Sequence, residues 1–221
     1  MANRVVLSWS GGKDSCMALT KLVHAGHEVV SLLTTVPKES DRTFAHGEKI
    51  EMIEQQSKSL AIPVHFVHCP LEQYTETFIK DLIQLKEQLS LDSVAFGDIY
   101  LDGHREWGEN VAAAAGLEAI FPLWRRQEES LALLTSFVQS GYKAAVIRIR
   151  QDIFDDSWLG KELDHDFLAS IQEHPVCPLG ENGEYHTFVY DGPLFQSSIP
   201  FTRGSIIAQE NSKRLEIGLL A

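Results

Sequence analysis

The chain has 221 residues, of which 44% are hydrophobic and 23% are charged, and this balance argues against an intrinsically disordered protein. A formal net charge of −12 without any long Lys/Arg tract argues against a nucleic-acid ligand, because proteins that hold phosphate backbones present basic surfaces. No apolar run reaches the roughly 18 residues of a membrane helix, and no secretory signal precedes the first apolar stretch. We therefore expect a cytoplasmic protein that does not contact a membrane.

The first 124 residues alternate between strand-like and helix-like patterns. Apolar runs predict five strands, at Arg4–Ser8, Glu28–Val36, Val64–His68, Ser93–Ile99 and Ala119–Leu123. Apolar residues at helical spacing predict helices between them, at Lys13–Ala25, His46–Leu60, Leu71–Leu89 and Arg105–Ala115. This alternation predicts an α/β fold: a Rossmann-like parallel sheet of about five strands with helices on both faces.

The pattern changes after Trp124. A helix at Ser130–Gly141 and a strand at Ala144–Arg150 precede a polar, acidic stretch that runs from Gln151 to His174. A hairpin is expected at Gly204–Leu219, with its turn near Asn211 and Ser212. We therefore predict two domains, residues 1–124 and a smaller α+β domain at residues 125–221, which we expect to bind the substrate.

The three cysteines give little sign of a metal or disulfide framework. Cys16, Cys69 and Cys177 are odd in number and far apart, and no CxxC pair occurs. A zinc ribbon or a set of disulfides needs closer and paired spacing. We expect three buried free thiols, since free cysteine behaves as a small hydrophobic residue.

The strongest chemical signal is a short string that follows the first strand and opens the first helix: Ser10-Gly11-Gly12-Lys13-Asp14-Ser15. Two glycines allow a tight turn that brings N–H groups close to an anion, and the helix that follows adds free N–H groups and the positive end of its dipole. Lys13 supplies a positive charge, Ser10 and Ser15 supply hydroxyls, and Asp14 is a candidate Mg²⁺ ligand. The string lacks the four-residue gap of a Walker A motif. The pattern therefore predicts a phosphate site of another kind.

A second signal is the loop Gly180-Glu181-Asn182-Gly183-Glu184-Tyr185-His186-Thr187, which is followed by Phe188-Val189-Tyr190-Asp191-Gly192-Pro193-Leu194-Phe195. Two carboxylates three residues apart on a glycine-containing loop can point into one site. An acidic surface turn before a buried strand is the alternative explanation of this loop taken alone.

The first string resembles the PP-loop of the N-type ATP pyrophosphatases, which have a Rossmann-like fold of the PP-loop or HUP type. The second string resembles the Gly-Glu-Gly-Gly-Glu loop and the Asp-x-Pro-Leu-Phe tail of the diphthine–ammonia ligase family. Three further segments match that family in order: Gly97-Asp98-Ile99, Phe121-Pro122-Leu123-Trp124 and Trp158-Leu159-Gly160-Lys161. The resemblance covers nearly the whole chain, with one departure, since Asn182 stands where the family usually has glycine.

The resemblance implies an ATP-dependent ligase that adenylates a carboxylate, releases pyrophosphate, and then transfers ammonia with loss of AMP. The implied acceptor is diphthine on elongation factor 2, with ATP, Mg²⁺ and ammonium as the other reactants. The implied catalytic residues are Lys13, Asp14, Glu181 and Glu184. ATP would be held by Ser10, Gly11, Gly12, Lys13, Asp14, Ser15, Thr34, Gly97 and Asp98, with the metal on Asp14. The substrate would be held by Arg105, Asn110, Glu181, Glu184 and Thr187.

Other functions remain open from the sequence. A PP-loop enzyme could act on a different carboxylate, particularly in a bacterial host, because elongation factor 2 belongs to eukaryotes and archaea. A tRNA-modifying enzyme of the same superfamily is disfavoured by the net charge of −12 and by the lack of cysteine pairs. An adenine-nucleotide-binding protein that hydrolyses nothing is a third alternative. The sequence does not decide the acceptor, the source organism or whether the chain forms a homodimer.

Overall fold

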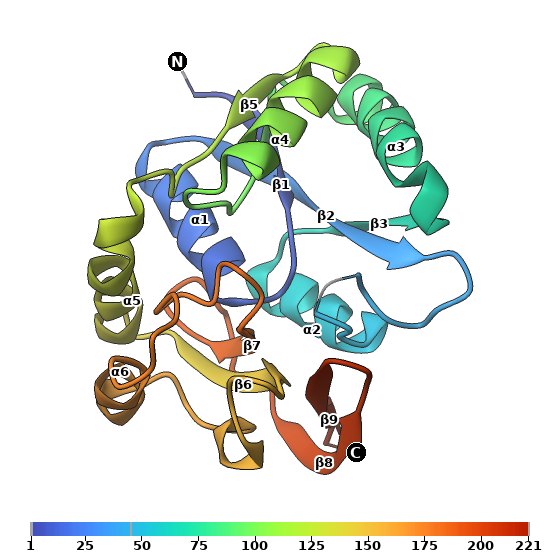
Figure 1. Cartoon of the computed structure of the whole chain (residues 1–221). Coiled ribbons are helices and arrows are strands. Elements are labelled where there is room, and N and C mark those ends of the chain that lie inside the picture. The colour runs from blue at the N-terminus through green and yellow to red at the C-terminus, as the bar shows by residue number, and fades with distance from the viewer. Residues whose placement is uncertain (1, 45, 221) are drawn as a thin grey trace. The chain divides into compact units, whose positions relative to one another are not determined.

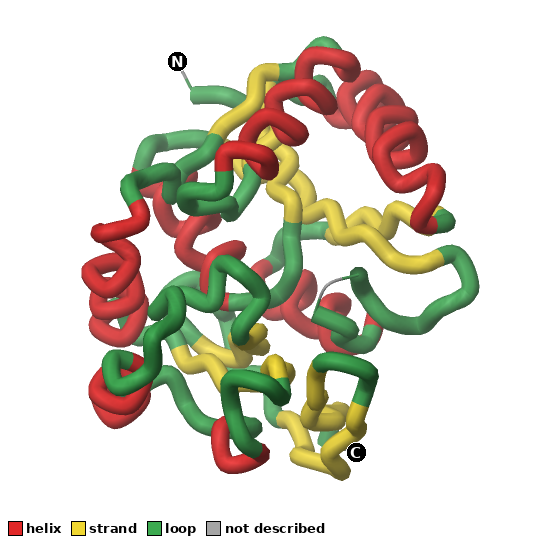
Figure 2. Tube along the Cα trace, viewed as in Figure 1, coloured by secondary structure: helices red, strands yellow, loops and turns green. Residues whose placement is uncertain are grey.

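A computed structural model describes residues 2–44 and 46–220 (Figure 1). The chain separates into two compact units. Unit 1 consists of Met1–Ser10 with Asp14–Arg125, and unit 2 consists of Gly11–Lys13 with Arg126–Ala221. Helices, strands and loops alternate along the tube in Figure 2. Within the described residues, no helix is both long and apolar enough to cross a membrane.

Unit 1 contains a five-stranded, wholly parallel sheet with the order β3-β2-β1-β4-β5. Its strands are β1 (Arg4–Ser8), β2 (Glu28–Pro37), β3 (Val64–Cys69), β4 (Ser93–Ala95) and β5 (Glu118–Ile120). The predicted fold class is therefore confirmed. The strand order reverses beside β1, and ligands of open α/β sheets bind at such a switch point, beyond the carboxyl ends of the strands.

Helices connect these strands: α1 (Lys13–His24), α2 (Ile50–Leu60), α3 (Tyr74–Leu89, after the 3-10 turn η1, Leu71–Gln73) and α4 (Asp102–Ala115). Residues from α3 and α4, including Phe78, Leu82 and Val111, share one buried cluster with Val6 and Val94 of the sheet. These two helices therefore cover one face of the sheet. Right-handed crossovers place α1 and α2 on the other face, as Figure 1 shows.

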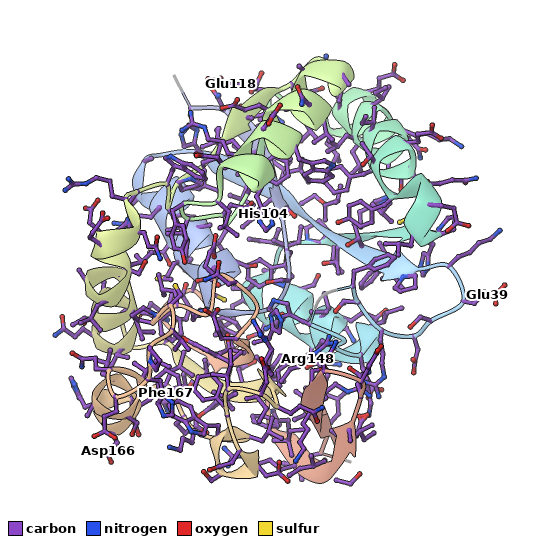
Figure 3. The ribbon with its side chains drawn as sticks, in the orientation of Figure 1. Glu39, His104, Glu118, Arg148, Asp166 and Phe167 are labelled. Atoms are coloured by element: carbon purple, nitrogen blue, oxygen red, sulfur yellow. The ribbon has the colours of Figure 1, made fainter. Side chains whose placement is uncertain are left out.

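Unit 2 contains a four-stranded antiparallel sheet with the order β7-β6-β9-β8. Its strands are β6 (Lys143–Arg150), β7 (Tyr185–Asp191), β8 (Phe201–Ala208) and β9 (Ser212–Leu219), and its helical segments are η2 (Gln127–Glu129), α5 (Ser130–Gln139), η3 (Asp156–Trp158) and α6 (His165–Ile171). The predicted C-terminal hairpin is β8 and β9. Phe167, labelled in Figure 3, packs edge-on against Trp158 and Tyr185 in the core of this unit.

Several predicted boundaries differ from the structure for local reasons. The fourth strand ends at Ala95 rather than Ile99, because its pairing with β1 and with β5 ends at that residue. The second helix begins at Ile50 rather than His46, because Thr43 and Glu48 close a turn through two hydrogen bonds to each other.

The acidic stretch 151–174 is partly helical, which the sequence analysis did not predict. Asp164 caps α6, where its Oδ1 accepts a hydrogen bond from the Phe167 N–H at 2.9 Å. Asp155 likewise precedes η3 and accepts from the N–H of Ser157 at 2.8 Å. Aspartate at a helix start satisfies N–H groups that have no partner within the helix. These acidic residues therefore shape the backbone as well as the surface.

Candidate functional site

The glycine-containing loop at residues 10–15 connects β1 to α1, as its sequence predicted. Gly11 has a φ of 80°, a left-handed conformation that glycine adopts without the steric cost of a Cβ atom. Ser15, which is buried, accepts a hydrogen bond from the N–H of Ser10 at 3.0 Å, and the two hydroxyl oxygens are 2.8 Å apart. Asp14 lies in the first turn of α1, where a negative charge is favourable. The strand-to-helix turn thus has the backbone form of an anion site.

Residues 11–13 of this loop belong to unit 2, because they are hydrogen-bonded to β7. The N–H of Val189 donates to the carbonyl of Gly11 at 3.0 Å, and the N–H of Lys13 donates to Thr187 Oγ1 at 3.0 Å. Thr187 is 1% exposed, so this bond is shielded from water. Thr187 was predicted to bind the substrate, and its hydroxyl accepts a hydrogen bond from the loop backbone at Lys13.

The ammonium group of Lys13 lies 4.9 Å from the centre of the Tyr185 ring. Cations are attracted to the negative face of an aromatic ring at such distances. The Lys13 side chain is buried, with 3% of the residue exposed. Tyr185 was absent from the predicted site residues, although the aromatic position of the second motif contained it. Tyr185 therefore contacts the charged end of the Lys13 side chain.

Gly97 and Asp98 follow the end of β4 in unit 1. A Cβ atom on Gly97 would lie 3.4 Å from the carbonyl carbon of Asp14 and 3.5 Å from the amide nitrogen of Ser15. Gly97 therefore lies within van der Waals reach of the backbone at the start of α1. Asp98 Oδ1 is 2.8 Å from Nδ1 of His104, a residue labelled in Figure 3. His104 belongs to the segment 102–110 after the fourth strand, whose position at a carboxyl end makes its residues site candidates, although only Arg105 and Asn110 of that segment were assigned a ligand role.

Thr34, Arg105 and Asn110 are the remaining predicted ligand residues of unit 1. Thr34 is buried and its hydroxyl donates to the carbonyl of Trp9 at 2.8 Å, so it holds the end of β1 to β2. Arg105 forms an ion pair with Glu109 at 2.8 Å and lies 5.0 Å from the ring centre of Trp124. Asn110 is exposed on α4. Ligand-binding roles for these three residues remain predictions.

The second motif forms a loop that is organised around the carboxylate of Glu184, which is 4% exposed. Glu184 Oε1 accepts from the Cys177 N–H at 3.2 Å and from Asn182 Nδ2 at 3.1 Å. Glu184 Oε2 accepts from the Asn182 N–H at 2.9 Å. Charge-assisted bonds of this kind are stronger than neutral ones. The carboxylate therefore holds the loop in shape, whatever else it does.

The departure from the family pattern at Asn182 does not strain this loop. Gly180 has a φ of 68° and Gly183 a φ of 79°, while Asn182 is not among the described residues with positive φ. A left-handed backbone is therefore required at the two glycines and not at Asn182. The amide of Asn182 adds a hydrogen bond that glycine could not make. Glu181 lies half-buried between these residues in the same loop.

The loop at residues 10–15 offers a suitable set of donors for Mg²⁺. A carboxylate at Asp14 and hydroxyls at Ser10 and Ser15 are hard oxygen ligands, which Mg²⁺ prefers. Cys16, by contrast, is fully buried, and burial raises the pKa of its thiol well above the usual value, with the charge of Asp14 adding to the effect. Cys16 therefore stays a neutral thiol and offers neither a nucleophile nor a soft metal ligand. All three cysteines are free and buried, as predicted.

Comparison with known proteins shows the family to which the chain belongs. Residues 3–119 match the diphthamide synthase N-terminal domain, and residues 129–217 match the diphthamide synthase C-terminal domain. The diphthine–ammonia ligase of Danio rerio is 32% identical over 241 aligned residues, which cover 98% of this chain and 93% of the relative. The diphthine–ammonia ligase of Homo sapiens is 28% identical, and the alignment covers 89% of this chain and 82% of the human protein.

Among solved structures, a U34-tRNA thiolase of Methanococcus maripaludis is similar, and the superposition covers 60% of this chain and 56% of the thiolase chain. The sequence identity is 15% and the TM-score is 0.41. This similarity is too distant to carry an argument about function.

Proposed function

We propose, from the premise that the chain belongs to the diphthamide synthase family, that it is an ATP-dependent, AMP-forming carboxylate–ammonia ligase. We further propose that the acceptor of the ammonia is diphthine on elongation factor 2. The similarity to the diphthine–ammonia ligases of Danio rerio and Homo sapiens supports this choice.

The first step is adenylation of the acceptor. An oxygen of the acceptor carboxylate attacks the α-phosphorus of ATP, the bond from that phosphorus to the bridging oxygen of the β-phosphate breaks, and pyrophosphate leaves. The departing group gains negative charge, so fixed positive charge and N–H donors accelerate the step. We assign Gly11, Gly12 and the start of α1 to the phosphates, and the Lys13 ammonium to the developing charge.

Mg²⁺ would be held by Asp14 and the neighbouring serine hydroxyls, and when bound it supplies charge neutralisation for the phosphates. Ser10 and Ser15 keep their hydroxyl groups together at the start of the helix. We further assign Thr34, Gly97 and Asp98 to the nucleotide, since Thr34 lies in β2 and Gly97 and Asp98 follow β4, the two strands that flank β1 in the sheet.

The second step is transfer of ammonia. The nitrogen attacks the acyl carbon of the adenylate, AMP leaves with the electrons of the broken C–O bond, and a proton leaves the nitrogen. We assign Glu181 and Glu184 to the binding of ammonium and the acceptance of that proton. Because Glu184 already accepts three hydrogen bonds within its own loop, Glu181 is the better candidate for the proton acceptor. Arg105 and Asn110 are assigned to the acceptor.

The observation that carries the proposal is the anchoring of residues 11–13 on β7. The hydrogen bonds from the Val189 N–H to the Gly11 carbonyl and from the Lys13 N–H to Thr187 Oγ1 join residues 11–13 to β7, the strand that follows the loop with Glu181 and Glu184. A loop used only to begin a helix would need no such attachment. This attachment supports giving both motifs a part in one reaction.

The reaction can be tested with purified protein, ATP, Mg²⁺ and ammonium, with and without elongation factor 2 that carries diphthine. We expect AMP and pyrophosphate in equal amounts, and one amide per AMP, only when the acceptor is present. AMP formation with another carboxylate but not with diphthine would keep the ligase assignment and change the acceptor. Tight ATP binding without any turnover would favour a nucleotide-binding protein.

A further inference from the structure

Unit 2 contains a cavity of about 460 Å³ that the proposed reaction does not explain. Residues of two segments line it: 127–131, which span η2 and the start of α5, and 175–184, which lead to β7. Pockets for small organic ligands have volumes of roughly 300–1,000 Å³. An ammonium ion is close in size to a water molecule, which takes about 30 Å³. The cavity is therefore large enough for a ligand much bigger than ammonium.

Every charged side chain that lines the cavity is negative. Glu128 is exposed on η2, whereas Glu184 is 4% exposed. No lysine, arginine or histidine is among the described residues that line it. Clefts lined by charges of one sign concentrate ligands of the opposite charge. The lining therefore favours a cationic ligand over a neutral or anionic one.

The charge of Glu184 is held by neutral groups. Its carboxylate accepts hydrogen bonds from the N–H of Cys177 and from both nitrogens of Asn182. A carboxylate has about four lone-pair positions, so these three bonds leave one position on Oε2 unused. Arg150 senses the same charge, but its pKa is raised first by the hydrogen bond and the charge of Asp152 and only then by Glu184. Both carboxylate oxygens of Asp152 bind the Arg150 guanidinium. The negative charge of Glu184 therefore remains available to a cation in the cavity.

Part of the lining is apolar. Leu131 of α5 contributes hydrocarbon surface, and so do Pro175, Val176 and Pro178 of the second segment. Burial of apolar surface stabilises a bound molecule roughly in proportion to the area removed from water. A hydrated metal ion would gain nothing from these side chains, whereas an alkyl chain would. The cavity thus combines negative charge with apolar surface.

We propose that this cavity binds an alkylammonium cation, with the charged nitrogen beside Glu184 and Glu128 and the alkyl part against Leu131 and residues 175–178. N–H groups of a primary ammonium form strong, charge-assisted hydrogen bonds with carboxylates, and a quaternary nitrogen is attracted by the same charges. The inference rests on the proposed function only for the origin of the cation, which is then a positively charged part of the acceptor. The binding itself needs neither ATP nor turnover.

The test uses the full-length protein with ¹³C-labelled methyl groups of leucine and valine, followed by NMR without ATP. The signals of Leu131 and Val176, which line the cavity, are assigned by their loss in Leu131→Met and Val176→Ile. Butylammonium, choline and 3,3-dimethylbutan-1-ol, the neutral isostere of choline, are titrated in separate arms at constant ionic strength. Leu71, which is 74% exposed in unit 1, is the internal control.

We expect both cavity signals to move saturably with a cation, and the neutral isostere to bind about tenfold more weakly or worse, because it lacks the charge. The Leu71 signal should not move. The tighter of the two cations shows whether the cavity takes a primary or a quaternary nitrogen. Cavity signals that ignore both cations overturn the proposal, and so does a neutral isostere that binds as tightly as choline and butylammonium.

Three variants complete the test. Glu184→Gln removes the buried charge and should weaken cation binding about tenfold or more. Glu128→Gln removes the exposed charge and should weaken it about twofold to fivefold. Glu173→Gln is the matched control and should leave the binding unchanged, because Glu173 is exposed and does not line the cavity.

Equal weakening in Glu173→Gln and Glu128→Gln overturns the proposal, because it indicates a general charge effect. If Glu184→Gln fails to fold, Glu128→Gln and the neutral isostere still decide. Formation of AMP is measured separately. Cation binding without AMP formation keeps this inference and removes the proposed reaction, whereas AMP formation without cation binding removes this inference alone.

Discussion

The main-chain N–H of Lys13 donates a hydrogen bond to the hydroxyl oxygen of Thr187 over 3.0 Å, although the two residues are 174 positions apart in the chain. The bond is buried and lies next to a second one, from Val189 to Gly11. Together they hold the backbone of residues 11–13 on β7. The shape of the loop therefore depends on a residue that no local sequence pattern connects with it.

Replacing Thr187 tests this relationship. Thr187→Val keeps the shape of the side chain but removes the acceptor of the Lys13 N–H, and a buried donor that loses its acceptor costs roughly 1–3 kcal/mol. We expect the free energy of unfolding in urea to fall by about this amount and ATP binding to weaken. Thr187→Ser keeps a hydroxyl and should restore both. If Thr187→Val changes neither the free energy of unfolding nor the affinity for ATP, the bond does not shape the loop.

The Glu184 carboxylate should contribute to stability as well as to chemistry. Glu184→Ala removes the acceptor of two main-chain N–H groups and one amide, so we expect the free energy of unfolding to fall by roughly 1–3 kcal/mol. Glu184→Gln keeps one carbonyl oxygen and should recover part of that loss. Urea unfolding of the three proteins measures the effect. An alanine variant as stable as the wild type would show that the loop does not depend on this carboxylate.

Gly108 in α4 offers a test of packing in unit 1. A Cβ atom at this position would lie 2.9 Å from the Phe121 ring and 3.1 Å from the Phe96 ring, and these two rings are stacked on each other. Gly108→Ala gains about 1 kcal/mol of helix propensity but overpacks the core at a cost of about 1–3 kcal/mol.

We therefore expect Gly108→Ala to lower the midpoint of thermal unfolding. Gly103 is the matched control in the same helix, because a Cβ atom there meets nothing within 4 Å. Gly103→Ala should be neutral or stabilising. If both variants behave alike, the contact between Gly108 and the two rings does not limit the packing.

The cysteines should be protected from alkylation in the folded protein. Burial raises the pKa of Cys16 well above its usual value, and Asp14 adds to this rise, while burial also raises the pKa of Cys69. Since the thiolate is the reactive form, iodoacetamide at pH 8 should leave Cys16 unmodified in native protein and modify it in urea. Mass spectrometry of the digested protein reports both states. Rapid labelling of native Cys16 would contradict the burial of this thiol.

The sequence was sufficient to predict the five-stranded parallel sheet, because strand and helix periods alternate clearly through residue 124. It was also sufficient to place residues 10–15 between a strand and a helix. It could not predict the bond from Lys13 to Thr187, since contacts across 174 residues leave no mark in a local pattern. The helix α6 was missed for a different reason, because it is only seven residues long and its capping aspartate was read as part of a charged surface.

In the second motif, too, the residue types were predictable from the sequence, but the contacts between them were not. Its glycines and glutamates indicated a loop with a chemical role, and both glycines have positive φ. The pattern did not indicate that Glu184 bonds to its own loop through Cys177 and Asn182, because that depends on how the chain folds back between residues 177 and 184. The Lys13–Tyr185 contact has the same origin. Residue type was thus predictable, while the partner of each side chain was not.

The most direct test of the account is the identity of the products formed from ATP. The protein should be incubated with ATP labelled at the α-phosphate, Mg²⁺, ammonium and diphthine-bearing elongation factor 2, and the products separated by chromatography. We expect labelled AMP, with pyrophosphate and amide in equal amounts, and no AMP from an Asp14→Ala variant that folds normally. Labelled ADP as the product would contradict cleavage between the α- and β-phosphates, and with it the role given to the loop at residues 10–15.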